Sequence, residues 1–374
     1  MSQDNEAAVP QELLKYLQII PDPRRTSHHN LRHHLIDIIV IAILAVISGA
    51  DTWNDIESFG EEKKEWLSLF LELPNGIPSH DTFARVFAHI NADAFERCFT
   101  AWSQATNTRI RGVIALDGKS VRRSRFGDSK ALHIVTAYAT ELGIALGQRT
   151  VDGKTNEITA VPELLEMLSL KGRIVTADAM LTQKWIVRKV KEHKADYVLA
   201  VKENQHRMLE DIKRTFDARD IQEDACADLR THVHGRNEMR SCRVTGDLSR
   251  MRDRELWDGI KSVVAVTDVR TVGGNTSTAI RYFISSLPAD ARQLLEVTRA
   301  HWKIENGLHW VLDVAFREDE SRVRIGHAQK NLALVRKFAL NLLRKDTSSK
   351  VGIAGRRKKA GWSVEYLKRI AGML

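Results

Sequence analysis

Apolar residues recur at helical spacing through the first hundred residues of the chain. The run from Ile38 to Ala50 is almost entirely apolar and predicts a buried helix. Residues 79–90 carry apolar side chains at helical spacing and begin with Ser79, a residue type that often caps helix N-termini. We therefore predict an all-helical N-terminal domain over residues 1–108. Its capped helix follows another helix after a turn, as in helix-turn-helix docking, so this domain is a candidate for DNA binding.

Strand-like segments replace helices after residue 109. Three of them come first, and strands then alternate with helices, an order that indicates a mixed α/β sheet with flanking helices. Residues 203–260 are more polar, and their pattern contains one or two exposed strands. Two further strands lead into a helix that contains residues 298–316. The strand-like segments are residues 111–120, 131–140, 143–152, 172–180, 196–204, 261–270 and 278–287.

The charge of the chain indicates which kind of partner it binds. The chain of 374 residues is long enough for two or three domains, each with a core of its own. Its formal net charge is +9, and basic residues cluster at 119–125 and 356–359. A basic excess favours a polyanionic partner, nucleic acid before membrane, because lysine and arginine release counterions from phosphates. General solubility is the alternative explanation of the charge.

Cysteines and the N-terminal residues bear on where the protein works. Three cysteines without a CxxC pair predict no disulfide framework and fit a reducing cytoplasm. The first residues lack the basic and apolar regions of a signal peptide. The apolar run at residues 38–50 is 13 residues long, which is too short to span a bilayer. We expect a cytoplasmic protein with no membrane partner.

Two of the apolar strands end in an aspartate. Asp117 follows four apolar residues, and Asp178 follows a buried-type strand. Apolar strands belong in the middle of a covered sheet, and open α/β folds place their ligand sites at the strand ends. We therefore expect the two carboxylates side by side, where a cation between them would relieve their repulsion. Hard oxygen ligands select Mg²⁺ or Mn²⁺. Either aspartate alone would more commonly be a helix cap or a turn residue.

Glu305 is the acidic residue of interest in the predicted helix at residues 298–316. It lies among apolar residues at helical spacing, with His301 and His309 one turn away on either side. Because burying a lone carboxylate is costly, we expect a buried Glu305 that completes the metal site of the two aspartates, with all three carboxylates around a common centre. Two such ions would activate the attacking oxygen and stabilise the leaving oxygen of a phosphodiester. In a basic protein this indicates phosphoryl transfer on nucleic acid.

Five segments of the chain form a specific set: VIALDGKSVRRS, IVTADAMLTQ, DYVLAVKENQ, HGRNEMR and RAHWKIENGLHWVLDVAFREDESRVRIGHAQKNLALVRKFALNLLR. Together they closely resemble bacterial insertion-sequence transposases of the DDE type, and within these the H-repeat-associated group. The resemblance covers most of the chain, from residue 22 to about residue 345. It implies an RNase-H-like catalytic domain over residues 109–345 with a β-rich insertion at about 203–260. We expect a basic C-terminal tail with an amphipathic helix to follow at 346–374.

The resemblance also implies an activity. The protein would be a DNA transposase that uses Mg²⁺ or Mn²⁺ to cleave and transfer the strands of an insertion element. Asp117, Asp178 and Glu305 would be its catalytic, metal-binding triad. The expected partners are double-stranded DNA, at the element ends and at the target, and a second copy of the chain in the DNA complex. Such a bacterial protein would associate with the nucleoid when it binds DNA.

Basic residues near the same sheet edge are candidates for holding the DNA backbone. Many relatives frame the glutamate with a tyrosine, an arginine and a lysine, and the corresponding positions here are Thr298, His301 and Leu312. The roles of that arginine and lysine therefore do not carry over, and His301, Arg299 and Lys303 are the candidates to replace them. Solvated surface charge is the alternative for each basic residue. The predicted DNA-contacting set is Lys119, Arg122, Arg123, Lys202, His234, Arg236 and His301.

Two zinc sites and one other function stay open as alternatives. His301, Glu305 and His309 lie on one helical stripe and could form a two-histidine, one-carboxylate site, as in a zinc-dependent hydrolase. Histidine beside tryptophan is more often a packing residue. A second combination matches no standard zinc spacing and consists of Cys226, His232, His234 and Cys242. The alternative function is that of a catalytically inactive, transposase-derived DNA-binding protein.

Overall fold

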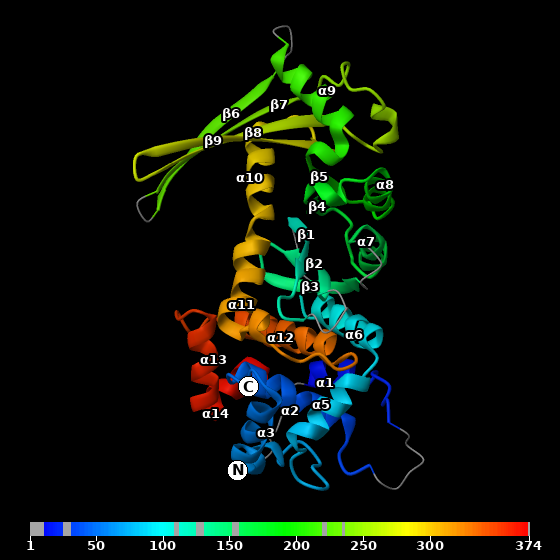
Figure 1. The fold of residues 1–374 in the computed structure, drawn as a ribbon, viewed down its shortest axis with the longest axis vertical. Helices are drawn as coiled ribbons and strands as arrows, with labels where there is room; N and C mark the ends of the chain where they lie inside the picture. The colour runs from blue at the N-terminus through cyan, green and yellow to red at the C-terminus, as the bar shows by residue number, and fades with distance from the viewer. Residues whose placement is uncertain are drawn as a thin grey trace, which may run out of the picture.

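The computed structural model describes residues 11–24, 31–107, 112–124, 131–151, 157–218, 223–233 and 236–372. Helices formed by the two ends of the chain lie together on one side of a large sheet, and helices cover the sheet itself (Figure 1). No helix within these ranges is long and apolar enough to cross a lipid bilayer.

The N-terminal part of the chain is helical, as the apolar spacing predicts. The apolar run forms helix α2 (Leu35–Ile47), which is buried along almost its whole length. Ser79 caps α5 (His80–His89), because its hydroxyl accepts a hydrogen bond from the backbone N–H of Thr82. The other helices of this part are α1 (Gln11–Leu17), α3 (Trp53–Glu62), α4 (Lys64–Leu67) and α6 (Ala92–Ala105).

One sheet contains all the strands of the described residues. They are β1 (Val113–Ser120), β2 (His133–Ala139), β3 (Ile144–Val151), β4 (Ile174–Ala177), β5 (Asp196–Val201), β6 (Asp224–Val233), β7 (Arg236–Thr245), β8 (Ser262–Val272) and β9 (Asn275–Ser285). Their order in space is β3-β2-β1-β4-β5-β9-β8-β7-β6. Strand β4 runs parallel to both β1 and β5, and the other neighbouring pairs are antiparallel.

Strands β1 to β5 form the RNase-H-like sheet that the resemblance implies. The first three are antiparallel, and β4 and β5 are reached through helices α7 (Glu157–Glu166) and α8 (Lys184–Glu192). One face of these strands packs against α7, α8 and α9 (His206–Asp217) through side chains such as Leu116 and Leu199. The predicted mixed sheet with flanking helices is therefore confirmed.

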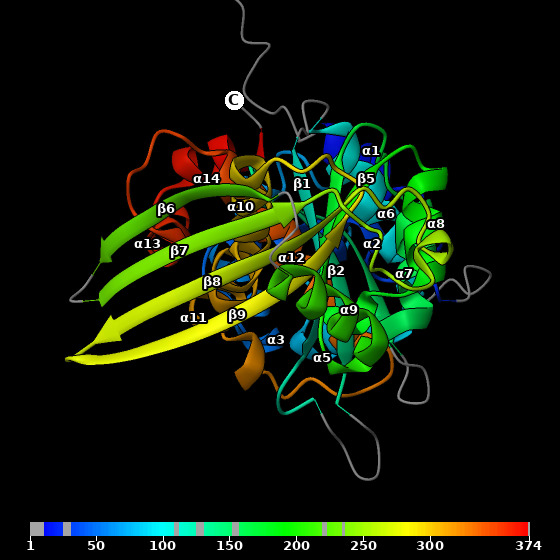
Figure 2. The same cartoon turned by 90° about the horizontal axis from the view of Figure 1, so that it is seen from above.

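Strands β6 to β9 extend this sheet into a long antiparallel ribbon that projects away from the rest of the molecule (Figures 1 and 2). Its root is fixed in two ways. Strand β9 pairs with β5 between Tyr282 and Ser285. Apolar side chains of the ribbon, including Val264 and Phe283, also pack against α10 (Ala291–His301). The ribbon therefore continues directly from the central strands, and α10 leads from it back toward the centre of the molecule.

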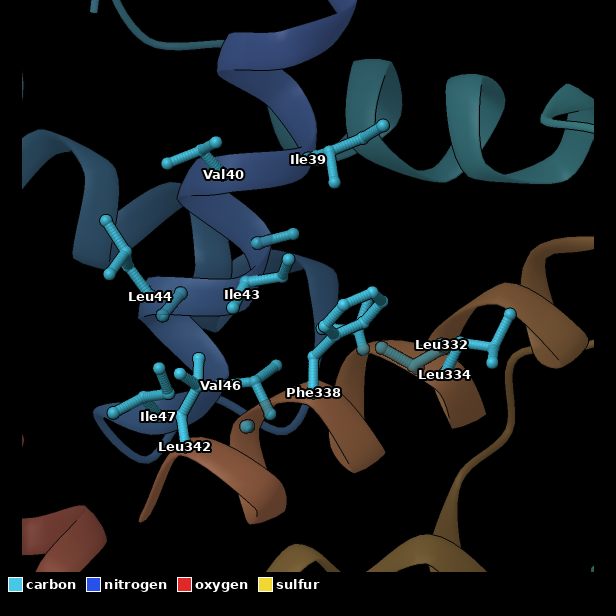
Figure 3. Close-up of a cluster of buried hydrophobic side chains, with 14 of the residues drawn as sticks. Ile39, Val40, Ile43, Leu44, Val46, Ile47, Leu332, Leu334, Phe338 and Leu342 are labelled. Atoms are coloured by element: carbon cyan, nitrogen blue, oxygen red, sulfur yellow. The ribbon is translucent and has the colours of Figure 1, made fainter. Parts of the chain in front are cut away.

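The chain after α10 connects the sheet to the N-terminal helices. A π-helical segment, η4 (Glu305–His309), leads into α11 (Trp310–Phe316) and a short turn, η5 (Glu318–Glu320). Helix α12 (Ala328–Lys345) is buried along most of its length and packs against α2 (Figure 3). Helices α13 (Ile353–Trp362) and α14 (Val364–Ala371) pack against α2 as well. Short turns complete the described chain at η1 (Ala179–Leu181), η2 (Glu203–Gln205) and η3 (Arg254–Leu256).

Candidate active site

Asp117 and Asp178 lie next to each other because of the register between β1 and β4. The last paired residues of these parallel strands are Leu116 and Ala177, so the next residues are Asp117, still within β1, and Asp178, directly after β4. Both strands reach this point through buried apolar residues. The structure therefore brings the two carboxylates together where the pairing of β1 with β4 ends, as expected, although β1 continues to Ser120 instead of ending at Asp117.

Asp178 is held by groups that favour its ionised form. Its carboxylate accepts a hydrogen bond from the backbone N–H of Ala179 at 2.8 Å and one from the ammonium of Lys202 at 2.9 Å. Burial raises the pKa of Asp178, but these two hydrogen bonds and the charge of Lys202 lower it more, so the pKa lies below its ordinary value. Asp178 is therefore a carboxylate at neutral pH.

Glu305 occupies the first position of the π-helical segment and is exposed, so the prediction that it is buried was wrong. The apolar side of the helix is buried through Ile304 and Leu308, whereas Glu305 lies on the other side. Within the segment the backbone N–H of Trp310 bonds to the carbonyl of Glu305, five residues back rather than four. Because it is exposed, the carboxylate of Glu305 needs no metal to offset a cost of burial. It is a candidate metal ligand because it lies at a cavity.

A cavity of about 480 Å³ joins the predicted residues. Strands β5 and β9 supply part of its wall, and α10 with the π-helical segment supplies another part. The polar side chains that line it come from six separate parts of the chain and are Asp117, Asp178, Lys202, Arg281, Tyr282, His301 and Glu305. All three predicted catalytic carboxylates thus face one space.

His301 enters the cavity wall from the end of α10 as a neutral side chain. Its Nδ1 lies 3.0 Å from the hydroxyl of Thr176, within hydrogen-bonding distance. Burial lowers the pKa of His301 to about 4, against the opposing charge of Asp178. His301 therefore carries no positive charge at neutral pH.

The oxygen donors at the cavity fit a hard divalent cation, because three carboxylates line it and hard oxygen ligands suit Mg²⁺ and Mn²⁺. In the structure each aspartate has other partners: Lys202 donates to Asp178, and His309 Nδ1 lies 3.4 Å from Asp117 Oδ2. Within the part of the chain that the structure describes, no three His, Cys, Asp or Glu side chains are gathered closely enough to hold a metal ion. The carboxylates share a cavity without forming the predicted common centre.

Comparisons with known proteins identify the family of the chain. A family model described as Transposase DDE domain matches residues 108–342, and one described as DDE_Tnp_1-associated matches residues 14–103. The chain belongs to the DDE transposase family. A protein of Escherichia coli O157:H7 named "Putative transposase YncI" is 40% identical over 370 residues, which cover 96% of this chain and 94% of that protein.

Two further proteins extend the comparison. The "H repeat-associated putative transposase YhhI" of Escherichia coli (strain K12) is 36% identical over 372 residues, covering 96% of this transposase and 97% of the relative. A piggyBac transposase, solved as a synaptic complex with hairpin DNA, superposes with a TM-score of 0.46 at 12% identity. That superposition covers 99% of this chain and 83% of the piggyBac chain.

The basic residues predicted to contact DNA fall into different environments in this transposase. Lys202 is 61% exposed at the cavity. Arg122 is 84% exposed, and its guanidinium lies 3.5 Å from Asp319. Arg123 is exposed too, and its backbone carbonyl accepts a hydrogen bond from Arg324. Lys119 differs from all of these.

Lys119 has a side chain that is only 13% exposed, and its ammonium is bonded to Asp313 and Glu318. We therefore leave it out of the surface that we propose for DNA. His234 lies outside the described residues. Arg236 begins β7, and only its backbone is described.

The zinc alternatives gain no support from the described residues. His301 bonds to Thr176, whereas His309 lies beside Asp117, so the two rings have different partners. Of the second candidate set, Cys242 is buried in β7, and the side chains of the others lie outside the described residues.

Arg281 and Trp302 are among the cavity residues that the sequence prediction missed. Arg281 on β9 forms an ion pair with Asp268, and its guanidinium lies over the ring of Trp302 at 4.2 Å from the ring centre. Both Arg281 and Trp302 line the cavity. Trp302 could have been found, since it stands three residues before Glu305. Arg281 carries no such signal, because only the pairing of β9 with β5 brings it to the site.

Proposed function

We propose that this DDE transposase uses a divalent cation, Mg²⁺ or Mn²⁺, to cleave DNA strands at the ends of its element and to join them to a target. Asp117, Asp178 and Glu305 are the residues that would hold the ion. One observation carries the proposal: Asp117 and Asp178, which directly follow the last paired residues of β1 and β4, are neighbours across the two strands and share a cavity with Glu305.

In each step of the reaction one P–O bond forms at phosphorus while another P–O bond breaks. In cleavage, a water oxygen bonds to phosphorus while the bond to the 3′ oxygen breaks, and that oxygen leaves as a hydroxyl. In joining, the 3′ hydroxyl oxygen bonds to a phosphorus of the target strand while the bond from that phosphorus to the target's own 3′ oxygen breaks, and that oxygen leaves as a hydroxyl. A bound cation would supply activation of the attacking oxygen and stabilisation of the leaving one. The protein has to hold the carboxylates and the DNA phosphate in fixed positions.

DNA recognition is the second part of the proposal. Double-stranded DNA, at the element ends and at the target, would bind through exposed basic residues, among them Lys202, Arg122 and Arg123. We assign DNA binding also to the helical N-terminal domain, residues 1–108, ahead of a catalytic domain at 109–345 and a basic C-terminal segment at 346–374. Because an element has two ends, we infer that two copies of the chain act in the DNA complex.

The test is a nicking assay on DNA that carries the sequences flanking this gene. Asp178→Asn should abolish nicking in Mg²⁺ and in Mn²⁺, because it removes one ionised oxygen donor from the cavity. Its DNA affinity should be equal to that of the wild type or higher, since a negative charge beside the phosphate is lost. Asp196→Asn is the matched control, because Asp196 also accepts a hydrogen bond from a lysine, Lys191, at 2.9 Å and does not line the cavity.

Two results would contradict the proposal. If Asp178→Asn nicks at the wild-type rate, the assigned site is wrong. If the wild type binds these ends tightly but nicks them in neither metal, the chain is the inactive DNA-binding alternative. Asp196→Asn should retain nicking, and a loss there equal to that of Asp178→Asn would show an effect on folding.

A further inference from the structure

Lys119 stands two residues after Asp117 on β1, so the two side chains leave the same face of the strand. Its side chain is 13% exposed, and its ammonium is bonded to Asp313 and lies 2.9 Å from a carboxylate oxygen of Glu318. A third carboxylate, that of Asp319, lies 3.8 Å away. The lysine is thus enclosed by acidic groups rather than directed at solvent.

The acidic partners of Lys119 all belong to the chain that follows Glu305. Asp313 lies on α11, and Glu318 and Asp319 form the turn η5. Glu318 is 1% exposed. Burial raises the pKa of Glu318, but the charges of Lys119 and nearby basic groups lower it to about 2. Glu318 is therefore a buried anion that depends on neighbouring cations, and losing one of them would be costly.

Contacts on either side of Lys119 join the same two segments. Before it, Asp117 Oδ2 lies 3.4 Å from Nδ1 of His309, which ends the π-helical segment. After it, the backbone N–H of Arg122 donates to Asp319 at 3.0 Å. The end of β1 and the residues just after it therefore contact the segment that follows Glu305 at three positions. Lys119 makes the middle and most buried of these contacts.

We propose that Lys119 is a positioning residue for catalysis: its ammonium ties the end of β1 to α11 and η5 and so fixes Asp117 relative to Glu305. The inference rests on the proposed function, in which Asp117 and Glu305 together hold the divalent cation. Catalytic groups lose much of their effect when they are displaced by about 1 Å, so a tie beside one of them has consequences for rate. This role replaces the DNA contact that the sequence suggests for Lys119.

The experiment compares Lys119→Met with Arg149→Met in the full chain. Arg149 offers a matched ion pair on β3: its side chain is 12% exposed and lies 3.2 Å from Glu96, which is 1% exposed. Neither residue of this control pair lines the cavity. Both variants should unfold at a lower temperature than the wild type, because each leaves a buried glutamate without its cation.

At a temperature where both variants stay folded, only Lys119→Met should be catalytically impaired. Its single-turnover nicking rate should fall by about 100-fold, as expected for a small displacement of catalytic groups. The Mn²⁺ concentration for half-maximal rate should rise by about tenfold, as for the loss of a group that supports metal ligands. DNA affinity and its salt dependence should stay at wild-type values, because Lys119 does not meet the phosphates.

A double variant covers the case in which Lys119→Met folds poorly. Lys119→Met/Glu318→Gln removes the uncompensated buried charge and should recover much of the stability. Nicking should stay as slow as in the single variant, since the tie is still absent. Recovery of the wild-type rate together with stability would overturn the proposal, because Lys119 would then act through stability alone.

The other outcomes are equally decisive. Weaker DNA binding with an unchanged nicking rate would return Lys119 to the DNA-contacting set. A loss of rate no greater than that of Arg149→Met would make the ion pair merely structural. If the wild type does not nick DNA at all, the proposed function is wrong, but the role of Lys119 can still be tested. The test is then the affinity for Mn²⁺ without DNA, measured by electron paramagnetic resonance. Lys119→Met should then bind Mn²⁺ more weakly than Arg149→Met, and equal affinities would overturn the inference.

Discussion

Lys202 and His301 face the same cavity but differ in charge at neutral pH. Lys202 donates to Asp178 and is 61% exposed, so DNA can reach its ammonium. His301 has a pKa of about 4 because it is buried, and its ring bonds to Thr176. A neutral ring offers no counter-charge to phosphate. We therefore assign electrostatic contact with the DNA backbone at this cavity to Lys202.

The salt dependence of DNA binding distinguishes these two residues. Lys202→Ala should weaken binding and reduce the slope of log K against log salt by about 0.9, the contribution of one phosphate contact on duplex DNA. His301→Gln should leave the slope unchanged, because it replaces one neutral side chain with another. The measurement is a series of binding titrations at increasing salt, with Asp178→Asn as the background in which DNA stays intact. A reduced slope for His301→Gln would mean that the histidine is protonated when DNA binds.

For single residues, the sequence predicts the position of a side chain in its own element better than its contacts with residues far away in the sequence. Asp117 and Asp178 could be placed because each follows a run of mostly apolar residues in neighbouring strands, and the pairing of these strands ends beside both. Lys119 was assigned to DNA because its partners lie far away along the chain: Asp313 is 194 residues distant. No local pattern reveals such a pairing.

The π-helical segment shows the same limit for a whole element. Spacing predicts one continuous helix through residues 298–316, with Glu305 buried on it, whereas the structure inserts a π turn at that residue. Groups from other elements hold the turn: Arg344 donates to the carbonyl of Gly307 and, at 2.7 Å, to the hydroxyl of Tyr138. Periodicity contains no information about these partners, which come from α12 and β2. The helix could be predicted, but not which side of it Glu305 occupies.

Gly307 provides a test of this element. A Cβ atom at Gly307 would lie 2.3 Å from the hydroxyl of Tyr138, so Gly307→Ala must displace the segment or the tyrosine. We expect the free energy of unfolding to fall by about 1–3 kcal/mol, as in other overpacked sites. Nicking should slow as well, because Glu305 lies two residues earlier on the displaced turn. Denaturant unfolding and single-turnover nicking measure the two effects.

The control for Gly307→Ala is a glycine in another helix. Gly355 lies in α13, where a Cβ would meet only the exposed side chain of Val351. Gly355→Ala should preserve nicking and gain up to about 1 kcal/mol from the helix propensity of alanine. Adding Tyr138→Phe to Gly307→Ala removes the clashing oxygen and should restore part of the rate. If Gly307→Ala unfolds and nicks like the wild type, the π turn is not held as described.

At the scale of the molecule, the two ends of the chain share one hydrophobic core. Helix α12 lies between them, and Phe338 packs against Phe95, Phe99 and Trp102 with ring centres 4.8–5.7 Å apart. Figure 3 shows Phe338 and Leu342 of α12 facing the apolar side chains of α2. The spacing of apolar residues predicts α2 and the other N-terminal helices, whereas α12 was not among the predicted elements. The spacing does not predict the association of these helices, because an apolar stripe indicates burial without naming the partner.

The basic run at 356–359 illustrates what this association changes. Its charge suggested a surface for a polyanion, yet Arg357 is buried and bonds inside the protein. Its guanidinium donates to the carbonyls of Val46 and Ala50 at 2.9 Å each, and to that of Ala315. It also forms an ion pair with Asp51 at 2.9 Å. Arg357 therefore joins α13 to the end of α2 and to α11, and it is not available to DNA.

Replacing Arg357 should thus lower the stability of the protein without lowering its affinity for DNA. Arg357→Met leaves Asp51 and the three carbonyls without their donor, and we expect a loss of about 3–5 kcal/mol in the free energy of unfolding. Lys358→Met is the control: Lys358 is the adjacent basic residue but is exposed, so stability should change by no more than about 0.5 kcal/mol. Denaturant unfolding measures both variants, and DNA titrations at a temperature where both are folded test binding. If the stability of Arg357→Met is unchanged, Arg357 does not join the two ends of the chain. If folded Arg357→Met binds DNA more weakly, the basic run at 356–359 contributes to DNA binding after all.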